Sequence, residues 1–245
     1  MTPFLIGTLF FLLGGCIQGS LGFGLAMIVV PPLLMVLPAT TVVPTLAVLS
    51  LTNTTLVLWH LRSKVQREIA VPLVVGAIIG LPGGIYLLTT LDGPLFKAGV
   101  GVLMIALSFV LLSGWSMPLQ NPKWALYPIG IVGGFLGGSI SISGPPVILF
   151  LTSQGVPKEN FRANIATYFT FGSIFGIAGF AIAGILTREV LVYSASVVPA
   201  LLVGTFVGMK LSNRIPQSLF RRLTLVCVIG MGLILTIRNV VELLG

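Results

Sequence analysis

The 245-residue chain is 56% hydrophobic and only 7% charged, with a mean hydropathy of +1.12. Its 13 basic and 5 acidic side chains are too few to cover a water-soluble globule of this size, whereas a bilayer core of about 30 Å needs no charged cover. In a membrane protein the net charge of +8 is interpreted first as topology, not as nucleic-acid binding. The composition predicts an all-α polytopic membrane protein whose main partner is the lipid bilayer, and no nucleic-acid partner is expected.

In chain order, the apolar segments cover residues 3–37, 41–60, 69–91, 95–113, 124–153, 164–186, 190–209 and 219–241. Most are close to the roughly 20 residues that one spanning helix needs, but 3–37 and 124–153 are much longer and are rich in Gly and Pro. Interrupted backbone is tolerated in a bilayer only where protein or a water-filled cavity satisfies its polar groups. Each long stretch is therefore predicted to form broken or re-entrant half-helices.

The two halves of the chain resemble each other at an offset of 119 residues. This offset places Gly14-Gly15 on Gly133-Gly134, Gly19-Ser20 on Gly138-Ser139, and Pro38 on Pro157. The order of interruptions, spans and charged turns also matches across both halves. We predict two membrane repeats, residues 1–122 and 123–245, of about five membrane segments each.

Basic residues indicate how the repeats are oriented. In a parallel arrangement they divide six against seven between the two faces, which is no bias. In an inverted arrangement ten share one face, namely Arg62, Lys64, Arg67, Lys123, Lys158, Arg162, Lys210, Arg214, Arg221 and Arg222. The other face then holds three, Lys97, Arg188 and Arg238. The positive-inside rule favours two inverted repeats, with both termini on the periplasmic side. Arg162 lies at the cytoplasmic mouth, where it is interpreted first as an anchor and second as a residue that attracts anions.

The sequence lacks the groups that most enzymes require. It has one histidine, His60, at the predicted end of a span, and its five acidic residues lie in turns or near the C-terminus. The lack of a carboxylate in mid-membrane argues against proton relays, hydrolytic carboxylate pairs and divalent-metal sites. We expect no enzymatic activity, no cofactor and no metal ligands.

Neutral polar residues gather at the two interruptions and form the candidate site: Gln18, Ser20, Gly22 and Gly24 in the first half, and Ser139, Ser141, Ser143 and Gly144 in the second. N-termini of half-helices carry unpaired N–H groups and a partial positive charge, so two that converge would bind an anion without a buried cation. The following spans add Asn53, Asn164 and Thr167 to the predicted substrate-binding residues. Phe23, beside the first interruption, is either a gate or a lipid-facing residue.

Close helix packing is the alternative interpretation of these small residues. Spacings such as Gly76-x-x-x-Gly80-x-x-x-Gly84 and Gly204-x-x-x-Gly208 are typical of helix interfaces in membranes, and Thr often bonds its own helix backbone. For any single Ser or Thr, packing is the simpler role. The paired interruptions taken together favour a binding site.

Several motifs resemble the sulfite exporter TauE/SafE family of bacterial membrane permeases. They are Gly15-x-x-x-Gly19-Ser20-x-Gly22-x-Gly24 before Pro31-Pro32-Leu33, Gly133-Gly134-x-x-Gly137-Gly138 before Gly144-Pro145-Pro146, and Gly155-Val156-Pro157 before Arg162-Ala163. The resemblance covers essentially the whole chain. One departure is Ser139-Ile140-Ser141-Ile142-Ser143, where many relatives are richer in glycine.

This resemblance implies an inner-membrane exporter of sulfite, sulfoacetate or a related organosulfonate. Because the cell interior is negative, an anion leaves with the potential and needs no coupling ion, and the sequence leaves uncoupled and proton-linked export open. The expected mechanism is a carrier that works by alternating access. A passive anion channel of the same architecture is the alternative, and a membrane-embedded enzyme or scaffold would need a soluble partner to supply catalytic groups. Small-residue faces would also permit a homodimer.

Overall fold

The computed structural model describes residues 2–91, 93–113, 122–211 and 217–244, and every regular element within them is helical. The first half contains α1 (Thr2–Leu21), α2 (Leu25–Leu34), α3 (Ala39–Leu61), the short 3-10 turn η1 (Arg62–Lys64), α4 (Arg67–Thr90) and α5 (Pro94–Ser113). The second contains α6 (Pro122–Ile140), α7 (Gly144–Ser153), α8 (Lys158–Ile182), α9 (Arg188–Leu211) and α10 (Gln217–Leu244). Seven of these helices are long and apolar enough to cross a membrane, which confirms the prediction of an all-helical polytopic membrane protein.

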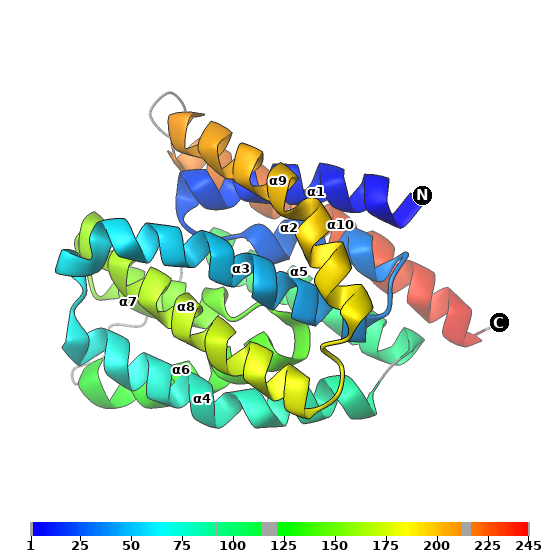
Figure 1. Cartoon of the computed structure of the whole chain (residues 1–245), viewed down its shortest axis with the longest axis horizontal. Coiled ribbons are helices and arrows are strands. Elements are labelled where there is room, and N and C mark those ends of the chain that lie inside the picture. Colours follow the sequence, from blue (N-terminus) through cyan, green and yellow to red (C-terminus); the bar gives the residue numbers. More distant parts are fainter. Residues whose placement is uncertain (1, 92, 114–121, 212–216, 245) are drawn as a thin grey trace.

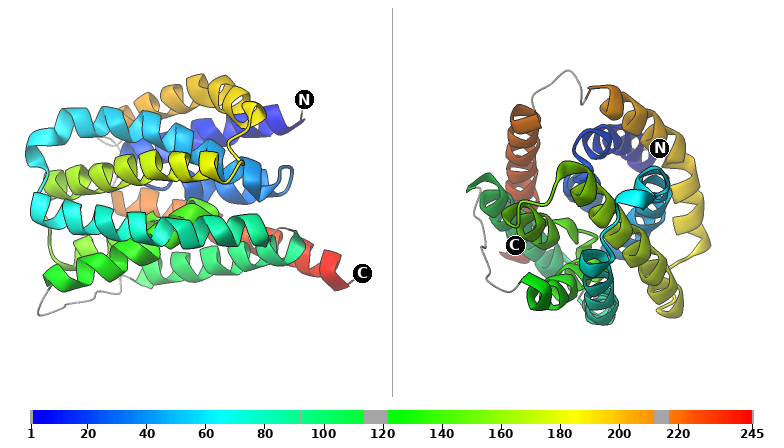
Figure 2. Two further views of the ribbon diagram at one scale, coloured as in Figure 1. Left: turned by 60° about the horizontal axis from the view of Figure 1, so that its bottom comes forward. Right: turned by 90° about the vertical axis from the view of Figure 1, so that its left-hand side faces the viewer.

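The long helices lie side by side along one common direction (Figures 1 and 2). The start of α1 and the end of α10 lie at one end of the bundle, and η1 lies at the other. We call the end that contains η1 the basic end, because the turn from Arg62 to Arg67 and the start of α8 at Lys158 meet there. An ion pair of 3.2 Å between Lys64 and Glu159 joins these two segments. Among the ten residues that share one face in the inverted arrangement, Arg214 lies outside the described residues, as do the side chains of Arg221 and Arg222.

Glycines lie at close helix contacts, at Gly101 and Gly232 between α5 and α10 and most extensively in two pairs, α1 with α9 and α4 with α6. A Cβ at Gly15 of α1 would clash with the carbonyl oxygen of Leu201, and one at Gly208 of α9 would clash with the backbone of Cys16. Glycines let helix backbones approach closely in a membrane, where packing rather than hydrophobicity drives association. The same glycines explain why α1 runs without a break through Gly14-Gly15, although the sequence suggests an interruption there. The low helix propensity of these glycines is offset by the close packing that they allow.

In the other pair, Gly84 of α4 lies against Phe135 and Ser139 of α6, and Gly76 lies against Tyr127 and Gly130. Residue numbers increase together along α4 and α6, so these two helices run parallel. The α1 and α9 pair is likewise parallel, since Leu12 contacts Gly204 and Cys16 contacts Gly208.

Helices α3 and α8 cross the centre of the bundle in opposite directions. The Thr170 hydroxyl donates to the Thr54 hydroxyl at 3.0 Å, and nearer the basic end the Asn160 amide donates to the Lys64 carbonyl at 3.0 Å. Residue numbers therefore rise along one helix as they fall along the other. The short helices α2 and α7 are each 10 residues long, or about half a bilayer core at 1.5 Å per residue. Helix α2 packs against α1, α3 and α10, and α7 packs against α6 and α8.

The backbone between each long helix and the short helix after it adopts positive φ angles. Gly22 and Gly24 have φ values of 86° and 105° between α1 and α2, a region that glycine enters without steric cost. Ser141, 119 residues after Gly22, has a φ of 57° between α6 and α7. A non-glycine residue is strained there, and the Ser141 hydroxyl donates to the carbonyl of Val43 at 3.0 Å, which holds this conformation.

Candidate functional site

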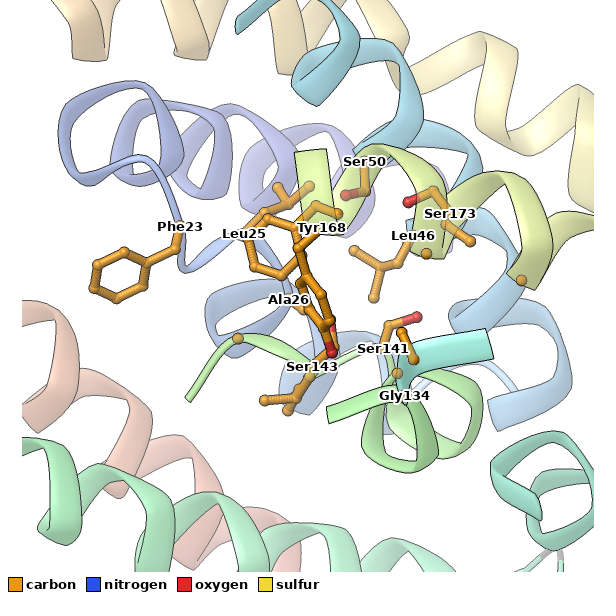
Figure 3. Close-up of a pocket in the computed structure, with 18 of the residues that line it drawn as sticks. Phe23, Leu25, Ala26, Leu46, Ser50, Gly134, Ser141, Ser143, Tyr168 and Ser173 are labelled. Carbon is orange, nitrogen blue, oxygen red and sulfur yellow. The ribbon is translucent and has the colours of Figure 1, made fainter. Parts of the chain in front are cut away.

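A cavity of about 80 Å³ lies at mid-height of the bundle, where α2 and α7 begin (Figure 3). A single water needs about 10–15 Å³ on a comparable measure, so the cavity has room for several waters or for an ion of a few atoms, but not for a drug-sized molecule. Its lining comes from α1, α2, α3, α4, α6, α7 and α8. The polar side chains that line it are Gln18, Ser50, Ser141, Ser143, Tyr168 and Ser173.

The N-terminus of α2 faces this cavity. Gly24 precedes the helix without a side-chain cap, and the first intrahelical bond runs from Ile28 N–H to the Gly24 carbonyl at 3.3 Å. The N–H groups of Leu25, Ala26 and Met27 therefore have no partner within the helix. All three residues line the cavity, where these N–H groups and the helix dipole favour negative charge.

The N-terminus of α7 also lines the cavity but offers fewer backbone donors. It begins at Gly144 and continues with Pro145 and Pro146, and proline has no N–H group. Hydroxyl groups lie close to this end. Ser143 lies directly before the helix, and the Tyr168 hydroxyl points toward it (Figure 3).

Not every hydroxyl around the cavity is free to donate. Ser141 gives its proton to Val43, so it offers the cavity only lone pairs while that bond is made. Tyr168 is 1% exposed, and its hydroxyl oxygen makes no bond of hydrogen-bond geometry with the residues that the structure describes. A buried polar atom without a partner is costly, so Tyr168 is the hydroxyl best placed to donate to a ligand.

Gln18 supplies a second buried polar group without a complete set of partners. Its side chain is 7% exposed, lines the cavity from α1, and leaves Oε1 without a hydrogen-bond partner among the described residues. Either orientation of a glutamine amide keeps similar packing, so the NH₂ group can turn toward the cavity as a donor.

The cavity brings together half of the residues that the sequence nominated, namely Gln18, Phe23, Gly24, Ser141, Ser143 and Gly144. Among these, Phe23 lies at the rim, and its ring is directed away from the other labelled side chains (Figure 3). The other six lie outside the lining: Ser20, Gly22, Asn53, Ser139, Asn164 and Thr167.

Four of these six make contacts within or between helices. Ser20 donates to the Gly208 carbonyl at 2.7 Å, which joins α1 to α9. Ser139 and Thr167 donate to carbonyls of their own helices, each at 2.8 Å. Asn164 accepts from the Gln66 N–H at 2.8 Å and so fastens α8 to the turn before α4. These contacts correspond to the packing role that the sequence left open.

The remaining two lie in different surroundings. Asn53 is 1% exposed, and neither amide atom finds a partner among the described residues. Gly22 lies next to the side chain of Arg162.

Sequence reasoning did not nominate three features of the lining. Ser50 and Ser173 lie within apolar helices, away from the Gly-rich interruptions that marked the candidate site. The third feature is the set of backbone N–H groups of residues 25–27, which no side-chain type reveals. Tyr168 was also not among the predicted substrate-binding residues. No charged side chain lines the cavity, and among the described residues no group of three His, Cys, Asp or Glu is placed to hold a metal ion.

Comparison with known proteins bears directly on this arrangement. Residues 7–235 match the family described as Sulfite exporter TauE/SafE. The chain belongs to the sulfite exporter TauE/SafE family. A curated member from Cupriavidus necator, named "Probable sulfite/organosulfonate exporter TauE", is 25% identical over 229 residues, which cover 89% of this chain and 88% of that protein. No solved structure matches the chain.

Membership of the TauE/SafE family confirms the resemblance found in the sequence motifs and makes the chain a membrane transport protein. A transport role agrees with the expectation that the chain is not an enzyme. It also agrees with a small neutral cavity, since a transporter must bind its substrate and release it again.

Proposed function

We propose that the chain exports a small sulfur-containing anion, such as sulfite, sulfoacetate or a related organosulfonate, across the bacterial inner membrane. The observation that carries the proposal is the convergence of the α2 and α7 N-termini on one small cavity lined by Tyr168, Ser143 and Gln18. These groups can all donate hydrogen bonds, and none carries a charge that would hold an anion permanently. The sulfite/organosulfonate name of the relative supports this class of substrate.

The mechanism we propose is alternating access by two inverted repeats, residues 1–122 and 123–245. Its support is the exchange of partners between the halves, in which α1 packs on α9 as α6 packs on α4. Helices α3 and α8, which correspond at an offset of 119, run antiparallel, as an axis in the membrane plane would require. The interruptions at Gly22–Gly24 and Ser141–Ser143 would then be the broken-helix segments that frame a central site.

We further propose that the basic end faces the cytoplasm, which leaves both termini outside. The membrane potential would then drive export, because moving one negative charge outward gains about 2.3 kcal/mol per 100 mV. An uncoupled carrier of this kind needs no carboxylate in the cavity.

Flux of sulfite and sulfoacetate from sealed proteoliposomes tests the proposal, with the potential clamped at several values by potassium and valinomycin. Flux that saturates with substrate and rises with an outward-driving potential would support an electrogenic carrier. Single-channel currents in planar bilayers would instead identify a passive anion channel. Absence of flux for both anions would refute the assigned substrate class.

Two variants connect the flux to the cavity. Ser143→Ala and Tyr168→Phe each remove one hydroxyl beside the α7 N-terminus, and we expect each to raise the KM about tenfold, the loss of a hydrogen bond worth about 1–1.5 kcal/mol. Ser194→Ala is the control, because it removes a hydroxyl from a buried serine that donates to the Val190 carbonyl at 2.7 Å and does not line the cavity. Equal KM values in all three variants would contradict the assigned site.

A further inference from the structure

Arg162, near the start of α8, lies against the interruption between α1 and α2. Its Cγ and Nε atoms are each 3.9 Å from the position that a Cβ on Gly22 would occupy. The Nε atom is buried and has no hydrogen-bond partner among the residues that the structure describes. Removing the Nε donor from water without a partner is costly, so this placement needs a reason beyond anchoring.

No carboxylate of the described residues forms an ion pair with this guanidinium. The two ion pairs within the described part of the chain join Lys64 to Glu159 and Lys123 to Glu68. Glu159 is three residues before Arg162 but is paired with Lys64. Arg162 thus presents an unpaired positive charge at the basic end of the bundle.

The corresponding contact in the other half of the chain contains no charged side chain. At an offset of 119, Ser141 corresponds to Gly22 and Val43 corresponds to Arg162. Ser141 and Val43 also touch, through the hydrogen bond of 3.0 Å from the Ser141 hydroxyl to the Val43 carbonyl. The same pair of positions therefore meets in both halves. In one contact the cationic side chain of Arg162 lies beside a glycine. In the other, an aliphatic residue lies beside a serine whose hydroxyl proton is already donated.

Arg162 is also next to the cavity lining. The Gly22 N–H donates to the Gln18 carbonyl at 2.7 Å, so Gly22 follows directly on α1, one helical turn after Gln18. Since Gln18 lines the cavity, Gly22 and the Arg162 side chain beside it are four residues, roughly 6 Å along the chain axis, beyond the lining. An anion passing from the basic end toward the cavity would meet Arg162 first.

We propose that Arg162 captures the transported anion from solution at the basic end and passes it to the neutral cavity. This rests on the anion transport proposed above. A guanidinium presents several donors in a planar fork that matches the oxygens of a sulfite or sulfonate group. At the opposite end of the bundle the corresponding residue is Val43, which carries no charge. The anion is therefore captured only at the basic end, and export must start from that end.

The test is the KM for sulfite measured separately from each face, in inside-out and right-side-out membrane vesicles. Impermeant maleimide labelling of Ser63→Cys, an exposed position within η1, shows which vesicles expose the basic end. We expect Arg162→Gln to raise the KM from the basic end about tenfold, or about 1.4 kcal/mol, and to leave the KM from the other end unchanged. Microscopic reversibility requires Vmax/KM to fall by the same factor in both directions of transport. Only the separate KM values can therefore differ between the two faces.

Lys158→Gln is the matched control, since it removes an exposed cation from the same helix end, one turn from Arg162, and should leave both KM values unchanged. Arg162→Lys should recover part of the affinity. If Arg162→Gln does not fold, Arg162→Cys in a background with Cys16→Ala and Cys227→Ala replaces it. Attaching a cationic thiol reagent should then lower the KM from the basic end, and attaching an anionic reagent should not.

An Arg162→Gln variant with the wild-type KM at the basic end, or with equal increases at both ends, would overturn this inference. Either result leaves the proposed anion transport intact, because the wild-type chain would still move sulfite. Wild-type vesicles that move neither sulfite nor sulfoacetate would instead refute the proposed function itself.

Discussion

The packing of α4 on α6 predicts a large difference between two chemically identical substitutions, Gly80→Ala and Gly99→Ala. A Cβ at Gly80 would lie 2.8 Å from the Phe135 nitrogen and 2.9 Å from the Ile131 carbonyl carbon, whereas ordinary contact begins at 3.4 Å. These neighbours are backbone atoms, which cannot turn aside as a flexible side chain can. A Cβ at Gly99, on the exposed face of α5, would meet nothing within 4 Å.

The expected magnitude follows from this geometry. The helices must separate by at least 0.6 Å to bring the 2.8 Å contact to 3.4 Å. A gap of roughly 0.5–1 Å forfeits about a quarter to a half of the dispersion energy across the interface, and overpacking of this kind costs about 1–3 kcal/mol. Replacing Gly by Ala in a helix gains up to about 1 kcal/mol, but both variants share this gain. The free energies of unfolding should therefore differ by about 1–3 kcal/mol, with Gly80→Ala the less stable.

Unfolding in mixed micelles of increasing SDS fraction, followed by far-ultraviolet circular dichroism, measures this difference. The comparison requires that both variants start with the wild-type helical signal. If Gly80→Ala proves as stable as Gly99→Ala, α4 and α6 do not pack through their glycines, and the reasoning behind the helix pairing is wrong.

Three further predictions concern other contacts of the described residues. Gly172→Ala places a methyl group in open space on the cavity lining, so sulfite KM should rise about threefold or more while the unfolding midpoint stays at or above the wild-type value. An unchanged KM would show that the cavity does not hold the substrate. Asn164→Leu leaves the Gln66 N–H without its acceptor and should lower the free energy of unfolding by about 1–3 kcal/mol, measured by SDS titration; a neutral result would mean that water replaces the amide. Thr54→Val and Thr170→Val should each destabilise the chain, and the double variant should cost less than the sum by about 0.5–1.5 kcal/mol, since one hydrogen bond is lost in all three; strict additivity would exclude that bond.

The sequence alone determined the class of this protein. Apolar composition and segment length are enough to predict helices in a bilayer, because backbone groups there must be satisfied within each segment. Glycine-rich motifs were sufficient to recognise the TauE/SafE family, which residues 7–235 then confirmed. The position of the cavity lining was also partly predictable, because Gln18, Gly24 and Ser143 lie where the long apolar stretches are interrupted.

Only the tertiary structure decided which small residues face the cavity. Ser139 and Ser143 are four residues apart with similar neighbours in sequence, yet Ser139 bonds its own helix and Ser143 lines the cavity. The positive φ at Ser141 reorients the chain between them, and the helical period of α6 cannot be extended across that turn. The contact of Arg162 with Gly22 joins residues 140 positions apart, and from the sequence its charge fitted an anchor better than a residue that attracts anions. Long-range packing sets these roles, since glycine and serine serve helix contacts and ligand binding equally well, and only the neighbours across the bundle distinguish the two.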